Sequence, residues 1–234
     1  MSVFHFKQFS IKQDETAMKV GTDSILLGAW LKIENKYNKI LDVGTGTGLL
    51  ALMLAQKMPN ALTTALEIDQ QAYEEAKTNV NASKWKKQIN VVLTDARCWE
   101  SKNKFDLIIT NPPYFDKSIL SKNESRKKAR HQDYFSIEDL VSLWTKHGNH
   151  NSELACILPV KESLKMIEIV NEKGFYTKKY VAVKSYAKDR EKRALLLFSK
   201  QKTKREDSEI YIYASEGEYS DKYIKLTKDF YLNF

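Results

Sequence analysis

The sequence predicts an α/β fold in which a mostly parallel sheet carries helices on both faces and ends in an antiparallel hairpin at one edge. Short apolar runs alternate with segments of helical spacing up to Gly174, and the pattern then changes to two strand-like runs around a charged turn. Such alternation is typical of βαβ units, whose crossovers keep buried strands parallel. A chain of 234 residues is long enough for one main domain.

Five apolar runs are the expected parallel strands: "KILDV" (39–43), "LTTALEI" (62–68), "INVVLT" (89–94), "FDLIIT" (105–110) and "ELACILP" (153–159). Apolar residues at spacings of three and four predict helices between them, over 47–58, 70–83, 136–148 and 161–172. Beyond Gly174, "YVAVKSY" and "RALLLFSK" predict the antiparallel pair at the edge. The final "DKYIKLTKDFYLNF" has helical spacing, with aromatic side chains that we expect to be exposed.

Composition excludes several classes of protein. No segment approaches the roughly 18 uninterrupted apolar residues of a membrane span, and "MSVFHFKQFS" lacks the apolar centre of a signal peptide. We therefore expect a cytoplasmic protein with no membrane partner. Cys98 and Cys156 lie far apart without a CxxC pair, so no disulfide framework and no metal site is expected.

The positive charge of the chain is concentrated in two windows. Residues 117–131 hold six Lys and Arg against one Glu, and residues 178–193 hold seven against two acidic residues. Their combined excess is larger than the net charge of the whole chain, which is +8. This distribution suits an anionic partner such as a nucleic acid, although solvated lysine-rich faces would look the same.

A glycine-rich turn follows the first expected strand. Gly44, Gly46 and Gly48 in "ILDVGTGTGLL" allow a ligand to approach the backbone closely, beside the open amides of a helix start. The dinucleotide fingerprint G-x-G-x-x-G requires a third glycine where Leu49 stands, so a pyrophosphate grip is disfavoured. The turn predicts a cofactor site of another kind.

Acidic residues at the ends of the next two strands support this prediction. Glu67 ends the second strand, where a carboxylate can accept both hydroxyls of a ribose, and Asp95 follows the third, near an adenine edge. A nicotinamide enzyme would also carry an acid after its second strand, so Glu67 alone does not discriminate. A tight turn with acids that face solvent is the structural alternative.

The fourth strand ends in an unusual cluster, Asn111-Pro112-Pro113-Tyr114. The prolines fix the backbone, the amide and carbonyl oxygens can accept hydrogen bonds, and the tyrosine ring can stack on a planar group. The cluster can therefore hold a planar amide or amidine nitrogen beside the cofactor. The alternative is a strand ended by proline with a tyrosine that only packs.

"DVGTGTG" and "NPPY" together resemble the class I S-adenosylmethionine-dependent methyltransferases, in their amino-methylating branch, over roughly residues 36–200. This resemblance implies a Rossmann-like fold with a seven-stranded, mostly parallel sheet and an antiparallel edge hairpin. It places Glu67 on the ribose and Asp95 on the adenine of the cofactor. It implies that the methionine moiety is surrounded by Asp42, Gly44, Gly46 and Gly48. It also implies a catalytic loop that consists of Asn111, Pro112, Pro113 and Tyr114.

A closer resemblance lies outside this core. "FKQFSIKQDETAMKVGTDSILLGAW" (6–30), "NPPYF" and "ARH" (129–131) are similar to the bacterial enzymes that methylate N6 of adenosine-37 in tRNA(Val). The resemblance implies S-adenosyl-L-methionine as cofactor and tRNA as partner, with Lys19, Thr22 and Asp23 over the methionine end. We expect a monomer with an N-terminal extension, 1–35, that packs over the cofactor site, and a methyltransferase domain, 36–234.

Two basic segments are the expected RNA contacts. The loop 117–131 follows the catalytic loop and suits a lid that closes over the substrate, while the turn near 188–193 offers a second contact or is merely an exposed hairpin tip. The side chains expected to reach phosphates are Arg126, Lys127, Lys128, Arg130, Lys188, Arg190 and Arg193.

Other functions fit part of the pattern. An Asn-Pro-Pro-Tyr loop can equally hold the side-chain amide of a protein glutamine, as in glutamine N5-methyltransferases, although those usually carry a helical substrate domain in front. DNA methylation ranks lower because no segment is large enough for a separate target-recognition domain. A non-catalytic RNA-binding module and a nicotinamide-dependent oxidoreductase are the alternatives from other classes.

Overall fold

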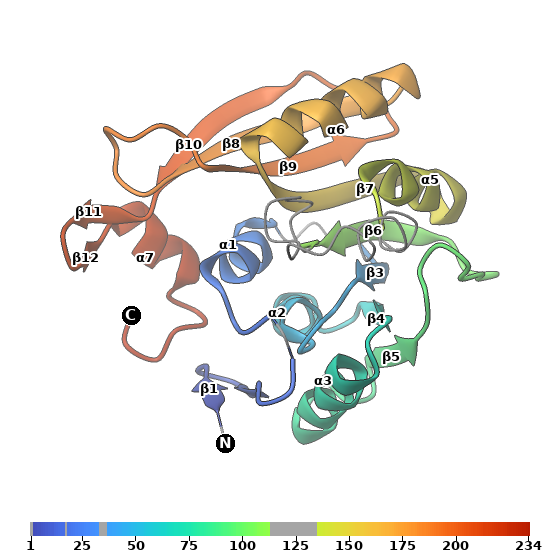
Figure 1. The fold of residues 1–234 in the computed structure, drawn as a ribbon, viewed down its shortest axis with the longest axis horizontal. Helices are drawn as coiled ribbons and strands as arrows, with labels where there is room; N and C mark the ends of the chain where they lie inside the picture. The colour runs from blue at the N-terminus through green and yellow to red at the C-terminus, as the bar shows by residue number, and fades with distance from the viewer. Residues whose placement is uncertain (1, 17, 33–36, 113–134) are drawn as a thin grey trace, which may run out of the picture.

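A computed structural model describes residues 2–16, 18–32, 37–112 and 135–234. Its central feature is an eight-stranded sheet in the order β10-β8-β9-β7-β6-β3-β4-β5 (Figure 1). The strands are β3 (Lys39–Val43), β4 (Leu62–Glu67), β5 (Ile89–Leu93), β6 (Phe105–Thr110), β7 (Gly148–Pro159), β8 (Tyr176–Lys184), β9 (Arg193–Ser199) and β10 (Glu206–Tyr211).

The five strands predicted to be parallel are confirmed. β5, β4, β3, β6 and β7 are neighbours in that order, and all their pairings are parallel. The predicted antiparallel pair, β8 and β9, is also present, but its place at the edge was wrong. β9 lies between β7 and β8, and β10 pairs parallel with β8 as an additional edge strand, so the described part of the chain gives the sheet eight strands rather than seven.

Helices cover both faces of the sheet, as predicted (Figure 1). Alternate side chains of a strand point to opposite faces, so Ile40 belongs to one apolar core and its neighbour Leu41 to the other. The first core includes residues of α1, α2 and α7, and the second includes residues of α5 and α6. The helices are α1 (Thr22–Trp30), α2 (Leu49–Lys57), α3 (Gln70–Ala82), α5 (Ile137–His147), α6 (Val160–Glu172) and α7 (Asp221–Thr227).

Side-chain caps explain where several of these helices begin. Asp69 precedes α3, and its carboxylate accepts from the amide of Ala72 at 2.9 Å. Ser136 and Asp139 form a reciprocal capping box at the start of α5. Such caps satisfy amides that have no partner within the helix. The α3 cap also fixes the point where the chain leaves the end of β4.

The carboxyl-terminal segment differs from expectation, because two of its aromatic residues are buried. Tyr223 of α7 and Phe230 after it join separate apolar cores. Tyr219, on the small sheet of β11 (Tyr213–Ser215) and β12 (Glu218–Tyr219), stacks on Tyr223 and is the more exposed of the two. The aromatic spacing of this segment is therefore largely a packing signal.

The two ends of the chain meet. β1 (Val3–His5) and β2 (Ser10–Lys12) form an antiparallel pair, and between them Phe6 makes an isolated bridge to Tyr231. The Lys7 ammonium donates to the carbonyl oxygen of Lys228 at 2.6 Å and to that of Phe234 at 2.7 Å. Residues 3–12 are thereby held against the carboxyl-terminal segment.

Neither a membrane span nor a metal cluster occurs in the described part of the chain. None of its helices is long and apolar enough to cross a bilayer. Within the same residues, no group of three or more His, Cys, Asp or Glu side chains is arranged to hold a metal ion.

Strand order determines where a ligand can bind. The chain runs outward from β3 to β4 and β5, and then returns to place β6 on the other side of β3. At such a switch point, loops at the carboxyl ends of neighbouring strands diverge and leave a crevice. The glycine turn after β3, Glu67 at the end of β4 and Asn111 after β6 all lie at this edge.

Candidate active site

A cavity of about 480 Å³ lies at this switch point. Its volume is within the range of pockets for small molecules and cofactors, which is about 300–1,000 Å³. The cavity is lined by the ends of β3, β4 and β6, by residues 15, 16 and 18–20, and by the first turn of α1. Seven of the predicted site residues contribute to the wall: Lys19, Gly44, Gly46, Glu67, Asp95, Asn111 and Pro112.

Other predicted site residues lie elsewhere. Thr22, Asp23, Asp42 and Gly48 do not contribute to the wall of the cavity. Pro113, Tyr114, Arg126, Lys127, Lys128 and Arg130 lie outside the described residues.

The glycine turn has the left-handed backbone that its sequence requires. Gly44, Gly46 and Gly48 have φ values of 68°, 56° and 82°. The amides of Gly44 and Thr45 both donate to the carbonyl oxygen of Leu66 at 2.9 Å, which ties the turn to the end of β4. A Cβ atom added at Gly44 or Gly46 would meet no atom within 4 Å, so the backbone there faces open space beside the cavity.

Glu67 holds the turn in this shape. One carboxylate oxygen accepts from the amide of Gly46 at 2.8 Å, and the other accepts from the amides of Ile68 at 2.9 Å and Asp69 at 3.0 Å. A carboxylate offers about four acceptor positions, so capacity remains for one hydroxyl group of a ligand. The acid predicted to bind a ribose is thus also a structural clamp between β4 and the turn.

We expect Glu67→Gln to weaken the binding of S-adenosylhomocysteine by about 10–100-fold, because the amide directs an N–H group at backbone donors and loses a charged acceptor. Calorimetric titration measures the change. As a check on the class of cofactor, S-adenosylhomocysteine should raise the melting temperature of the wild type, whereas NAD should not. Equal affinity of wild type and variant for S-adenosylhomocysteine would contradict the role given to Glu67.

Asp42 lies buried beneath the same turn. The Thr45 hydroxyl donates to one of its carboxylate oxygens at 2.6 Å, and the other oxygen has no hydrogen-bond partner in the described part of the structure. Burial, together with repulsion from Glu67, raises the pKa of Asp42 from 3.8 to about 7 against the opposing effect of the Thr45 bond. The folded protein therefore disfavours the ionised form of this side chain.

The raised pKa predicts a pH-dependent stability effect. Below pH 3.8 the Asp42 carboxyl is protonated in both the folded and unfolded chains, and its contribution to stability is lost as pH rises through about 7. Asp42→Asn does not titrate, so at pH 8 the unliganded variant should exceed the wild type by about 2 kcal/mol, or roughly 4–8 °C in melting temperature. The advantage should shrink at pH 5. A difference that is the same at both pH values would refute this explanation.

Asp95 is engaged by a neighbour. The Arg97 guanidinium contacts both of its carboxylate oxygens, at distances between 2.6 and 3.0 Å. These hydrogen bonds lower the pKa of Asp95, so the carboxylate stays ionised at neutral pH. Both residues line the cavity, and a ligand that reaches Asp95 must share it with Arg97. Sequence reasoning missed Arg97, although its spacing of two from Asp95 is a signal for a local ion pair.

Asn111 has a defined amide environment. Its nitrogen, Nδ2, donates to the hydroxyl oxygen of Ser24 in α1 at 2.7 Å. Its oxygen, Oδ1, is buried without a hydrogen-bond partner among the described residues. A buried acceptor without a partner is costly, so the site is suited to a ligand that brings an N–H group.

Ile68 is a further wall residue that sequence reasoning missed. Its side chain is 61% exposed, directly after Glu67, and lines the cavity. An exposed large apolar side chain beside a ribose-type acid can pack against a flat ring. The run "LTTALEI" contained this signal, but Ile68 was interpreted as the end of the strand.

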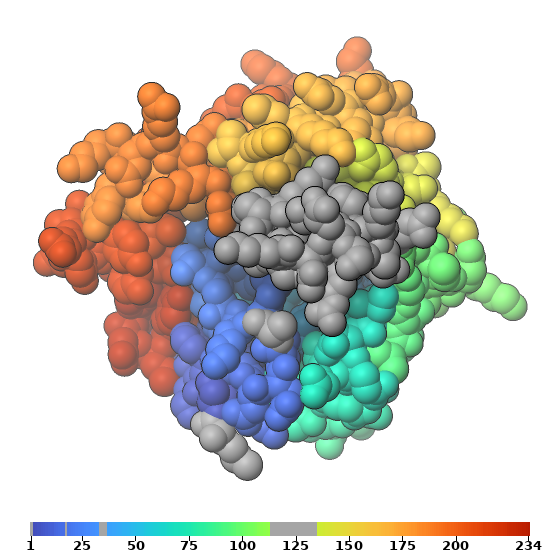
Figure 2. All heavy atoms as spheres, viewed as in Figure 1, coloured from blue at the N-terminus to red at the C-terminus, as the bar shows by residue number. Residues whose placement is uncertain are grey.

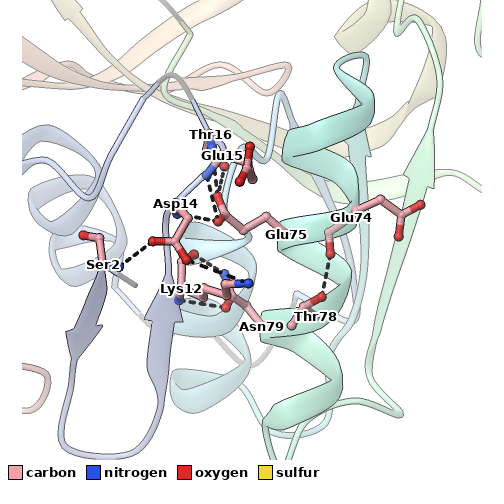
Figure 3. A network of polar contacts seen from close by, with 9 residues as sticks. All are labelled: Ser2, Lys12, Asp14, Glu15, Thr16, Glu74, Glu75, Thr78 and Asn79. Atoms are coloured by element: carbon pink, nitrogen blue, oxygen red, sulfur yellow. Dashed lines mark hydrogen bonds and ion pairs between the residues drawn. The ribbon is translucent and has the colours of Figure 1, made fainter.

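The amino-terminal wall of the cavity is fastened to α3 (Figure 3). The Glu75 carboxylate accepts from the amides of Asp14, Glu15 and Thr16 at 2.6, 3.2 and 3.0 Å, and from the Thr16 hydroxyl. One turn along α3, Asn79 contacts two other segments.

The Asn79 side chain joins the amino-terminal segment to the glycine turn. Its oxygen accepts from the Lys12 amide at 2.8 Å, and its nitrogen donates to the carbonyl oxygens of Lys12 and Thr47, both at 2.9 Å. The Val20 amide donates to the Gln13 side chain at 2.7 Å, which closes a loop between these two residues. Thr16, Met18, Lys19 and Val20 of this loop line the cavity.

The predicted contact residues of the second basic window have different surroundings. Arg193, at the start of β9, forms an ion pair with Asp23 of α1, with Nε and Oδ2 3.1 Å apart. Burial raises the pKa of Asp23 despite this pair. Lys188 and Arg190 are exposed, on the turn that projects at the upper left in Figure 2 (orange).

The residues present fit S-adenosylmethionine. Gly44 and Gly46 bring the backbone to the cavity without side chains, Glu67 has capacity for a hydroxyl group, and Ile68 offers an apolar surface. Asn111 Oδ1 is an acceptor that has no partner within the described ranges, and it can accept from a second molecule that donates an N–H group. The cavity is large enough for an adenosine joined to a methionine.

Comparison with known proteins agrees with this description. The family model "Methyltransferase small domain" matches residues 16–127. A relative from Pseudoalteromonas translucida, named tRNA1(Val) (adenine(37)-N6)-methyltransferase, is 40% identical over 232 residues, covering 99% of each chain. A relative of the same name from Histophilus somni is 41% identical over 234 residues, covering 99% of this chain and 98% of its own.

A solved structure supports the fold. The structure of an Agrobacterium tumefaciens protein, described as a predicted O-methyltransferase, matches with a TM-score of 0.69 at 15% identity, over 89% of this chain and 96% of that chain. The sheet order, the cofactor cavity and the family match define a class I methyltransferase, an enzyme that uses S-adenosylmethionine. The relatives that match over nearly the full length identify the family within this class. The chain belongs to the family of tRNA1(Val) (adenine(37)-N6)-methyltransferases.

Proposed function

We propose that this chain transfers a methyl group from S-adenosylmethionine to the exocyclic N6 of adenine-37 in tRNA1(Val). The observation that carries the proposal is the buried oxygen of Asn111, which lacks a partner among the described residues and lies at a cofactor-sized cavity. The full-length relatives, named for this reaction, support the choice of substrate.

The residues after β6 account for the chemistry. The N6 atom of adenine is a weak nucleophile, because its lone pair is delocalised into the ring. Asn111 Oδ1 and the Pro112 carbonyl oxygen would each accept one N–H group, which orients the nitrogen and frees its lone pair. S-adenosylmethionine supplies, when bound, a methyl group on a positively charged sulfur, so the site needs no strong base.

Recognition of the RNA calls for additional groups. The target base would leave the anticodon loop and stack on Tyr114, with Pro113 keeping the catalytic loop rigid. Phosphate contacts are proposed for Lys188 and Arg190, which are exposed, and for Arg126, Lys127, Lys128 and Arg130. Arg193 would contact RNA while it also holds Asp23.

The remaining cofactor contacts follow the same proposal. Lys19 would approach the methionine end from the wall of the cavity, and contacts to the same end are proposed for Thr22, Asp23, Asp42 and Gly48. Residues 1–35 would form an extension over the cofactor site of the domain 36–234. We further propose that the enzyme acts as a monomer in the cytoplasm. Light scattering on the purified protein at its working concentration measures its mass and so tests whether it is a monomer.

A decisive experiment incubates the purified protein with S-adenosylmethionine and unmodified tRNA1(Val) transcript, and then identifies modified nucleosides by mass spectrometry. We expect N6-methyladenosine in the transcript, and none when adenine-37 is replaced by guanine. Methylation confined to a protein substrate would favour a glutamine N5-methyltransferase. Cofactor and RNA binding without any methylated product would favour a non-catalytic RNA-binding module.

A further inference from the structure

We propose that Ser24 is a positioning residue, which fixes the side-chain amide of Asn111 with its oxygen turned toward the amino group of the substrate. The inference rests on the proposed function and assigns a role to a side chain outside the catalytic loop. Ser24 and Asn111 are 87 residues apart in the sequence, and both line the cavity. Their contact is a direct hydrogen bond of 2.7 Å from Nδ2 to the serine hydroxyl oxygen.

The orientation of this amide decides whether the site can act. The two ends of an asparagine side chain are nearly equal in size, but the oxygen accepts hydrogen bonds and the nitrogen donates them. An amino group of adenine needs an acceptor. If the amide turned over, its NH₂ group would face the N–H of the substrate, and the lone pair would not be oriented for transfer.

Ser24 is itself held in place by the fold. It lies in the first turn of α1, directly after Asp23, which is paired with Arg193 at the start of β9. The helix that carries the hydroxyl is thereby attached to the sheet that carries Asn111. In the structure the hydroxyl accepts from the nitrogen end, and the oxygen is the end without a partner among the described residues.

Three variants test the role. Ser24→Ala removes the partner of Nδ2, and Ser24→Thr keeps a hydroxyl group at the same position. The control is Ser163→Ala, because the Ser163 hydroxyl also makes a hydrogen bond, to the carbonyl oxygen of Val160 at 2.7 Å, but Ser163 is buried in α6. The measurements are kcat and KM for methylation of tRNA1(Val) transcript, the affinity for S-adenosylhomocysteine and the melting temperature.

We expect Ser24→Ala to lower kcat about tenfold, as the loss of one hydrogen bond that orients a catalytic side chain does, with little change in KM for S-adenosylmethionine. Ser24→Thr should restore most of the activity, and Ser163→Ala should leave kcat unchanged. Because Ser24 acts only through Asn111, adding Ser24→Ala to Asn111→Ala should cause no further loss of the residual rate.

Several results would overturn the inference. Undiminished kcat in Ser24→Ala would do so, as would a loss of kcat that tracks cofactor affinity and melting temperature and is not rescued by threonine. An additive loss in the double variant would also show that Ser24 acts independently of Asn111. If the wild type methylates the transcript, any of these results overturns only the role given to Ser24. If the wild type is inactive on the transcript, the proposed function fails, and the role of Ser24 fails with it.

Discussion

Asn111→Ala should lower kcat for tRNA methylation by about 10²–10³-fold, the range seen when one preorganised hydrogen-bonding group is removed from an active site. The variant loses the oxygen that orients the substrate nitrogen. It keeps Gly44, Gly46 and Glu67, which would hold the cofactor. The affinity for S-adenosylhomocysteine, measured by calorimetry, should therefore stay within a fewfold of the wild type.

Asn81→Ala is a matched control, because Asn81 is exposed on α3. It should retain wild-type kcat and melting temperature. If Asn111→Ala lost cofactor binding and activity together, Asn111 would be a cofactor residue rather than the group that orients the acceptor nitrogen. If the variant kept its activity, the chemical basis of the proposed function would fail.

Glu75→Ala should lower the free energy of unfolding by about 3–4 kcal/mol, because three backbone amides and the Thr16 hydroxyl lose their shared acceptor. Urea denaturation monitored by fluorescence measures this loss. The affinity for S-adenosylhomocysteine should fall as well, since the segment released from α3 carries the cavity residues Met18 and Lys19.

The adjacent Glu74 provides the control. Its carboxylate is exposed and accepts from Gln70, and in Figure 3 it extends away from the amino-terminal segment. Glu74→Ala should change the free energy of unfolding by no more than about 0.5 kcal/mol. Equal stability of the two variants would show that the Glu75 contacts do not fasten the segment.

The parallel core of the fold could be predicted because its signals are local. Strands such as 105–110 are mostly apolar runs, and helices such as 70–83 carry a clear period. β10 has no such signal: "EDSEIY" is mostly exposed, and only its backbone pairing with β8 makes it a strand. The insertion of β9 between β7 and β8 likewise depends on tertiary pairing.

Those residues of the candidate site that lie at strand ends, or that need a special backbone conformation, could be predicted from the sequence. Gly44, Gly46, Glu67 and Asn111 all occur at the cavity for this reason. Pairings across long sequence distances could not be foreseen. The bond from Asn111 to Ser24 arises only when the sheet brings the segments together.

Charged residues illustrate the same limit. Asp23 was expected at the cofactor from the family resemblance, and Arg193 at the RNA from its charge, yet in the folded chain they contact each other. No role was predicted for Glu75 from the sequence, because a glutamate in a helix is ordinarily exposed to solvent. Its burial becomes apparent only when the amino-terminal backbone is placed against α3.

The bridge between Phe6 and Tyr231 has a consequence for synthesis of the chain. A ribosome delivers Lys7 221 residues before Lys228, so this anchor cannot form until the later segment has emerged. Nascent protein can pack β3 to β6 and fasten residues 14–16 to α3 beforehand, whereas residues 3–12 gain their carboxyl-terminal anchor only after Lys228 has been made.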